Sequence, residues 1–161
     1  ITVLVDTDHA GDAETRKSTS CALVLLGTFQ VTGSSRDQLI PSLSSGESEY
    51  YGIGFGAAEG LYCQAVLSEC GYEISVHIFS DSTTGKSIAS RLGLGRLKKV
   101  EVRFLLVQSL VKDGRISIFK IAAEENLADI GTKWLPGPRF RMLADRLSQV
   151  ASTASSSAGA G

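Results

Sequence analysis

The stretch VLVDTDHAGD, residues 3–12, places three acids at the end of an apolar run. The run is rich in β-branched residues and predicts a strand. Asp6, Asp8 and Asp12 follow within seven positions. Asp and Gly are ordinary turn residues, so a solvated turn is the simplest explanation. Whether the charge serves a chemical purpose depends on what the rest of the chain places beside it.

Length and composition indicate one folded domain. The chain has 161 residues and a net charge of −1, and no apolar run reaches the roughly 18 residues that span a bilayer. Cys21, Cys63 and Cys70 are an odd number without a C-x-x-C pair, which favours reduced thiols. We therefore expect an intracellular, reducing compartment rather than secretion. Because the strand pattern begins at Ile1, we also expect sequence upstream.

The order of predicted elements favours a mixed sheet covered by helices. Three antiparallel strands open the chain, with a hairpin turn near residues 27–28. The periodicity predicts strands at 1–5, 21–26, 29–33, 73–80 and 114–121, and helices at 44–70, 83–92, 100–112, 124–134 and 138–150. This order predicts an α/β fold with a five-stranded mixed sheet and helices on its faces.

Composition sets the expected end of this domain. Residues 1–150 carry the periodic pattern, whereas residues 151–161, ASTASSSAGAG, contain only Ala, Ser, Thr and Gly. Such a segment buries too little apolar surface to offset its ordering entropy. We expect a folded domain over 1–150 and a disordered tail over 151–161.

Positive charge is concentrated in residues 86–120. This segment holds nine Lys or Arg against two acids, a net +7, while the remainder holds seven against fifteen, a net −8. Solvated helix charges are the simpler explanation, and a phosphate-binding face is the alternative. For the second, we expect the nucleic-acid contacts to come from the Gly-rich loop and its flank, at Arg96, Lys98, Lys99 and Arg103.

Four acids stand at the ends of predicted elements: Asp6, Glu49, Asp81 and Asp129. Ser44 and Glu47 form an S-x-x-E capping box, which explains Glu47 and leaves Glu49 free on another side of the helix. Each of the others has a simpler explanation, since Asp81 is placed as a helix N-cap and Asp129 as a solvated helix residue. Carboxylates from several elements, however, suit Mg²⁺ or Mn²⁺, and paired ions support phosphodiester hydrolysis.

Four stretches in this order resemble one known family. They read VDTDHAGDAETRKSTS at 5–20, SSRDQLIPSLSSGESEYYG at 34–52, IFSDSTTGKSIA at 78–89 and NLADIGTK at 126–133. Together they resemble the ribonuclease H domain at the end of the polyprotein of copia-class LTR retrotransposons. The resemblance covers about residues 3–136.

The resemblance implies a fold, an activity and a set of residues. It implies a ribonuclease H fold that hydrolyses the RNA strand of RNA·DNA hybrids during reverse transcription, with two Mg²⁺ (or Mn²⁺) ions. It also implies an upstream reverse transcriptase domain in the same polyprotein, and a cytoplasmic or virus-like-particle location. The family's catalytic, metal-binding carboxylates correspond to Asp6, Glu49, Asp81 and Asp129.

Two alternatives remain open from the sequence. His9 and Gly33 stand where the family commonly has Trp, which leaves room for a catalytically decayed module that binds nucleic acid or tethers neighbouring domains. SDSTTGKS at 80–87 differs by one residue from a phosphate-binding loop. That nucleotide-binding reading is disfavoured, because Ser80 replaces the first Gly and Asp81 puts negative charge where phosphate oxygens would lie.

Overall fold

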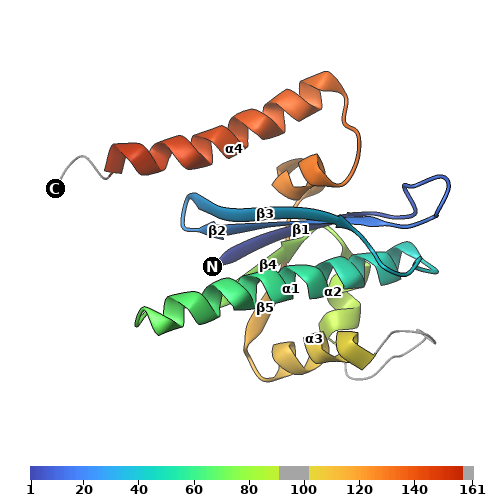
Figure 1. Ribbon diagram of the computed structural model, residues 1–161, viewed down its shortest axis with the longest axis horizontal. Coiled ribbons are helices and arrows are strands. Elements are labelled where there is room, and N and C mark those ends of the chain that lie inside the picture. The colour runs from blue at the N-terminus through green and yellow to red at the C-terminus, as the bar shows by residue number, and fades with distance from the viewer. Residues whose placement is uncertain (91–101, 158–161) are drawn as a thin grey trace.

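A five-stranded mixed sheet forms the centre of the molecule (Figure 1). The computed structural model describes residues 1–90 and 102–157. The strand order is β3-β2-β1-β4-β5. The strands are β1 Thr2–Asp8, β2 Thr19–Leu26, β3 Phe29–Asp37, β4 Val76–Ser80 and β5 Ile116–Lys120. The predicted mixed sheet and the opening antiparallel hairpin are both confirmed.

The register of β1 sets the position of the first acids. β1 is antiparallel to β2 and parallel to β4, and Val5 lies opposite both Ala22 and Ser80. β4 is in turn parallel to β5. The carboxyl ends of parallel strands meet at one edge of a sheet, where open α/β sheets commonly place their functional residues. Asp6, the next residue of β1, and Asp81, the residue directly after β4, therefore lie side by side.

Helix α1, Ser45–Glu69, packs unusually close to β1. A Cβ added at Gly52 would lie 2.2 Å from Thr7 Oγ1, and one at Gly56 would lie 2.3 Å from Val5 Cγ1. The glycines let the helix backbone approach the strand where any side chain would clash. Together with α2, Thr83–Ser90, and α3, Val102–Lys112, this helix covers one face of the sheet.

The start of α1 follows the predicted capping box with one difference. The Ser44 hydroxyl accepts the Glu47 N–H at 3.2 Å, as expected for an N-cap. The Glu47 carboxylate reaches back one residue further than the box predicts, to the Leu43 N–H at 2.8 Å, and it also accepts the Tyr51 hydroxyl at 2.7 Å. Glu47 is therefore occupied by the helix start, and Glu49 is not.

The opposite face is covered by the C-terminal segments. These are the short 3-10 helices η1, Ala123–Glu125, and η2, Leu127–Gly131, and the long helix α4, Gly137–Ser157. Figure 1 shows α4 running over the β3–β2 side, away from α1. Leu127 and Leu143 bury their side chains against Leu4 and Leu23 of the sheet. The sheet thus has an apolar core on both faces.

Several local predictions differ from the structure. The helix expected at 124–134 is two short 3-10 segments, and Trp134 at the end of this range is 88% exposed. α4 continues through residue 150 to Ser157, where we expected a disordered tail from residue 151. Ala and Ser do not break a helix, and the first Gly of the tail comes later, at Gly159.

None of the helices within residues 1–90 and 102–157 is both long and apolar enough to cross a membrane.

Candidate active site

Four carboxylates from four elements converge at the carboxyl edge of β1 and β4. The pKa values of Asp6, Glu49 and Asp81 are raised, chiefly by burial, and negative charges of other members of the set add to this effect. Every pair within the set interacts in this way, so the four side chains lie within Coulombic range of one another. We call this set the carboxylate cluster: Asp6 on β1, Glu49 on α1, Asp81 after β4 and Asp129 on η2.

Asp6 and Glu49 hold their negative charge at a cost. Burial, with the charges of Asp81 and Asp129, raises the pKa of Asp6 to about 6, against the opposing effects of Thr132 and Lys133. Burial and then the charge of Asp6 raise the pKa of Glu49 to about 8. Carboxyl groups with pKa values this far above the ordinary range lack sufficient positive charge around them.

Asp129 is the exception within the carboxylate cluster. Burial again opposes its charge, but two cations outweigh that effect and hold its pKa below the usual range. Lys133 Nζ lies 2.6 Å from Asp129 Oδ1, and Arg139 Nη2 lies 3.2 Å from Asp129 Oδ2. Arg139 also donates to the carbonyl oxygens of Ala123 and Glu124, at 2.8 and 2.9 Å. Both oxygens of Asp129 are thereby held by cations that follow it in the sequence, Lys133 just after η2 and Arg139 on α4.

Two polar side chains attach η2 to β1. Asn126 is fully buried; its Nδ2 donates to Val5 O at 2.9 Å, and its Oδ1 accepts the Ala128 N–H at 3.3 Å as the N-cap of η2. The hydroxyl of Thr132 donates to Asp6 Oδ2. Since Asn126 and Thr132 bracket Asp129 in sequence, these contacts fix that acid beside Asp6.

The simpler explanations of the candidate acids fail for two of them. Helix α2 begins at Thr83, so Ser82 precedes it and Asp81 lies outside the N-cap position. Asp129 is 8% exposed rather than solvated. For Asp12 the simple explanation holds, because its carboxylate accepts the N–H groups of Glu14 and Thr15 within a turn.

The donor chemistry of the carboxylate cluster fits a hard divalent ion. Its ligands are carboxylate oxygens, its charge is buried, and its members repel one another, so an added cation relieves the repulsion. Within the described residues, no three His, Cys, Asp or Glu side chains are spaced to hold an ion as they stand. The Lys133 ammonium, 2.6 Å from Asp129 and 3.7 Å from Asp6, lies between two of the members.

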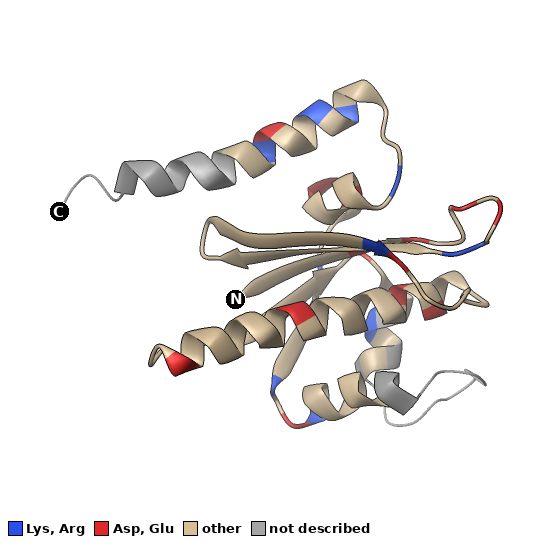
Figure 2. Ribbon diagram, viewed as in Figure 1, with Lys and Arg blue, Asp and Glu red and all other residues tan. Residues whose placement is uncertain are grey.

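The predicted phosphate contacts lie outside the described part of the chain. Arg96, Lys98 and Lys99 fall in residues 91–101, and the side chain of Arg103 is likewise not described. Figure 2 marks Lys and Arg in blue and Asp and Glu in red over the described part of the chain. Helix α1 carries acids and no Lys or Arg, whereas the first half of α4 is mainly basic.

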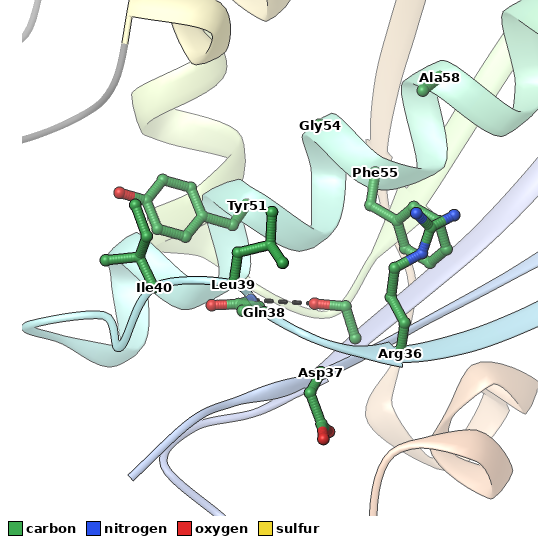
Figure 3. A pocket seen from close by; sticks show the side chains of 10 residues that line it. Arg36, Asp37, Gln38, Leu39, Ile40, Tyr51, Gly54, Phe55 and Ala58 are labelled. Carbon is green, nitrogen blue, oxygen red and sulfur yellow. Dashed lines mark hydrogen bonds between the residues drawn. The ribbon is translucent and has the colours of Figure 1, made fainter. Parts of the chain in front are cut away.

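A separate pocket of about 250 Å³ lies between the end of β3 and α1 (Figure 3). Gln38 is one of the lining residues and donates to Ser20 Oγ and to Ser48 O, both at 2.9 Å. Arg36 lies over the ring of Phe55, 3.9 Å from its centroid. The residues lining this pocket do not include a member of the carboxylate cluster, so the two features are distinct.

Curated relatives of the chain are transposon polyproteins. The chain is 27% identical over 139 residues to the retrovirus-related Pol polyprotein from transposon TNT 1-94 of Nicotiana tabacum, covering 85% of this chain. It is 26% identical over 145 residues to that from transposon RE1 of Arabidopsis thaliana, covering 88% of this chain. The chain spans about 10% of the length of each. No family model matches it.

Solved structures with the same fold are ribonuclease H domains. The N-terminal RNase H domain of rv2228c from Mycobacterium tuberculosis, solved as a maltose-binding-protein fusion, superposes with a TM-score of 0.54 at 15% identity, covering 96% of this chain and 99% of that one. LC11-RNase H1 in complex with an RNA/DNA hybrid gives 0.55 at 14% identity, covering 81% and 92%. The chain therefore has the ribonuclease H fold, and its homologues are retrovirus-related Pol polyproteins of plant transposons, which confirms the resemblance found in the sequence.

Four residues that shape the site were given no role from the sequence: Asn126, Thr132, Lys133 and Arg139. The first three lie within NLADIGTK, one of the stretches that carries the resemblance. Asn directly before a short apolar helix is an N-cap signal, and it was available from the sequence. Arg139 gives no such signal, because its contact with Asp129 depends on the turn between η2 and α4.

Proposed function

We propose that this chain is a divalent-metal-dependent ribonuclease H domain that hydrolyses the RNA strand of RNA·DNA hybrids during reverse transcription of a retrotransposon. The observation that carries the proposal is the carboxylate cluster, in which four acids from separate elements meet at the strand edge of a ribonuclease H fold. A fold alone does not define an activity, so the site must carry the argument.

The cluster supplies ligands for Mg²⁺ or Mn²⁺, two ions in this proposal. Asp6, Glu49, Asp81 and Asp129 would hold them through carboxylate oxygens. When bound, such ions activate water and stabilise the leaving oxygen of a phosphodiester. The protein's own part is to fix the ligands: Thr132 orients Asp6, and Arg139 orients Asp129.

The substrate and the polyprotein context rest on the relatives. LC11-RNase H1 was solved with an RNA/DNA hybrid, and the transposon relatives are Pol polyproteins. We propose the same hybrid substrate here, with Arg96, Lys98, Lys99 and Arg103 contacting phosphates, and an upstream reverse transcriptase domain as the covalent neighbour. With this arrangement we propose that the domain acts in the cytoplasm or in a virus-like particle.

A cleavage assay tests the proposal. The chain is incubated with an RNA·DNA hybrid labelled on the RNA strand, with Mg²⁺ or with EDTA, beside the same RNA as a single strand. We expect cleavage of the hybrid with Mg²⁺, none with EDTA, and little of the single strand. A separate binding assay and an ATPase assay on the same chain cover the alternatives. Absence of cleavage with retained hybrid binding would favour the decayed binding or tether module. ATP hydrolysis would favour the nucleotide-binding alternative.

A further inference from the structure

Lys133 has an unusual place in the carboxylate cluster. It lies four residues after Asp129, just beyond the end of η2, and its ammonium lies 2.6 Å from Asp129 Oδ1 and 3.7 Å from Asp6 Oδ2. A single positive charge thus bridges two acids that arrive from different elements, η2 and β1. Asp81 also acts on this ammonium, since its charge contributes to the raised pKa of Lys133 after the larger effects of Asp129 and Asp6.

Lys133 and Arg139 contact the same carboxylate but are held differently. Arg139 is fixed by the carbonyl oxygens of Ala123 and Glu124, and its side chain is 23% exposed. The ion pairs of Lys133 are to members of the cluster, and its side chain is 41% exposed. Lysine is a compact charge on a flexible stem that reaches solvent readily. Lys133 is therefore able to leave the cluster without a change in the backbone, whereas Arg139 stays.

Two positive ions placed between the same two carboxylates repel each other strongly. A divalent ion that uses oxygens of Asp6 and Asp129 meets the Lys133 ammonium at those same oxygens. Metal binding at these oxygens would break the ion pairs of Lys133 with Asp6 and Asp129. The lysine would therefore stabilise the metal-free protein and weaken the affinity for metal.

We propose that Lys133 is an internal counter-ion of the carboxylate cluster, which holds the metal-free site together and is displaced when divalent ions bind. The proposal rests on the proposed function, because it requires that the cluster bind metal. It assigns Lys133 a positioning and affinity-setting role in place of a ligand role, and it predicts that the domain binds metal more weakly than its four acids alone would.

The test compares Lys133→Met with the unaltered chain and with Lys112→Met. Met keeps the unbranched stem of Lys without its charge, and Lys112 is an exposed lysine at the end of α3. Mg²⁺ affinity is measured by titration calorimetry at pH 8.5, above the pKa of about 8 of Glu49, and melting temperature is measured in EDTA and in Mg²⁺.

For Lys133→Met we expect a melting temperature below that of the unaltered chain in EDTA and a larger rise on adding Mg²⁺. We expect Mg²⁺ to bind about three- to tenfold more tightly, a modest gain because Lys133 is partly exposed and its ion pairs are partly screened. Lys112→Met should match the unaltered chain in all three measurements.

Other outcomes separate the two proposals. Equal Mg²⁺ affinity in Lys133→Met and the unaltered chain would overturn the counter-ion role while leaving the metal site intact. Weaker affinity in Lys133→Met would overturn it as well, and would show that the lysine supports the metal-bound state. Absence of saturable Mg²⁺ binding in the unaltered chain would instead overturn the proposed function.

Discussion

Glu49 and Asp129 reach the same carboxylate cluster from opposite faces of the sheet, and their electrostatic states differ. Burial and the neighbouring charge of Asp6 raise the pKa of Glu49 to about 8. Asp129 is also opposed by burial, yet Lys133 and Arg139 hold its pKa below the ordinary range. Glu49 lies on α1, which carries no Lys or Arg. Asp129 lies on η2 and forms ion pairs with Lys133 and Arg139, which follow it in the sequence.

The difference shows two ways of placing a charge in a buried site. On the α1 face the position is set by backbone packing, since Gly52 and Gly56 let the helix touch β1. On the η2 face it is set by hydrogen bonds and ion pairs, through Asn126, Thr132 and Arg139. Steric packing tolerates no larger side chain, whereas polar contacts can be exchanged for other polar contacts, a metal ion among them.

The largest expected effect comes from breaking the packed face. In Gly56→Val, the added side chain meets Val5 where a Cβ alone would lie 2.3 Å from its Cγ1. We expect the free energy of unfolding to fall by about 3 kcal/mol or more, equally in EDTA and Mg²⁺. Ala65→Val, an exposed position of the same helix, is the control for the lower helix propensity of Val. Urea titrations of both variants measure the difference, and similar midpoints would show that α1 does not need this close contact.

A smaller effect is expected from breaking the polar face at Asn126. Asn126→Ala removes the cap of η2 and leaves Val5 O without its buried donor. We expect a loss of about 2–3 kcal/mol in the free energy of unfolding, together with weaker Mg²⁺ binding. Asn126→Ser keeps a capping acceptor without adding a buried charge and loses the donor to Val5 O, so it separates the two contributions. Unchanged stability in Asn126→Ala would mean that η2 is held by its apolar contacts alone.

The pH dependence of the metal-free protein sharpens the comparison. Asp6 and Glu49 have folded-state pKa values of about 6 and about 8, above the unfolded values of about 3.9 and 4.3. The contribution of each group to the free energy of unfolding is fully present below its unfolded-state pKa and is lost as pH rises through its folded-state pKa. We expect the melting temperature in EDTA to fall from pH 5 to 8.5, and Glu49→Gln to flatten the upper part. A melting temperature that rises across this range would contradict the charge assignment.

The smallest effect is expected from the far end of α4. The described apolar contacts of this helix come from its first half, at Leu143 and Leu147. Deleting residues 151–161 should therefore change the melting temperature by no more than about 2 °C. A larger drop, measured by calorimetry, would show that the continuation of α4 to Ser157 contributes to the fold.

The order of elements and the four acids were predictable because they follow from local patterns. Alternating apolar residues, the Ser44 cap and the positions of Asp6 and Asp81 after apolar runs are visible over short windows. The resemblance then selected the same four acids. The simple explanation of Asp129 failed because its burial depends on contacts of η2 with β1 and β2, more than a hundred residues away in the chain.

The cations of the site were less accessible from the sequence. Lys133 and Arg139 look like ordinary surface charges, and their role arises where the turn after η2 brings them back onto Asp129. The end of α4 was also missed, because composition predicts disorder from the absence of apolar residues and takes no account of a helix already started.

The central claim is that the four acids act as one divalent-metal site, and Asp81→Asn tests it most directly. Asn has nearly the same shape as Asp, so the change removes one charge from the cluster with little change in packing. The measurement is Mg²⁺-dependent cleavage of the labelled RNA·DNA hybrid, with Asp113→Asn, an exposed acid after α3, as the matched control. We predict that cleavage falls by orders of magnitude in Asp81→Asn and is unchanged in Asp113→Asn, while the melting temperature of Asp81→Asn in EDTA stays level or rises. Cleavage by Asp81→Asn at the rate of the unaltered chain would contradict the claim.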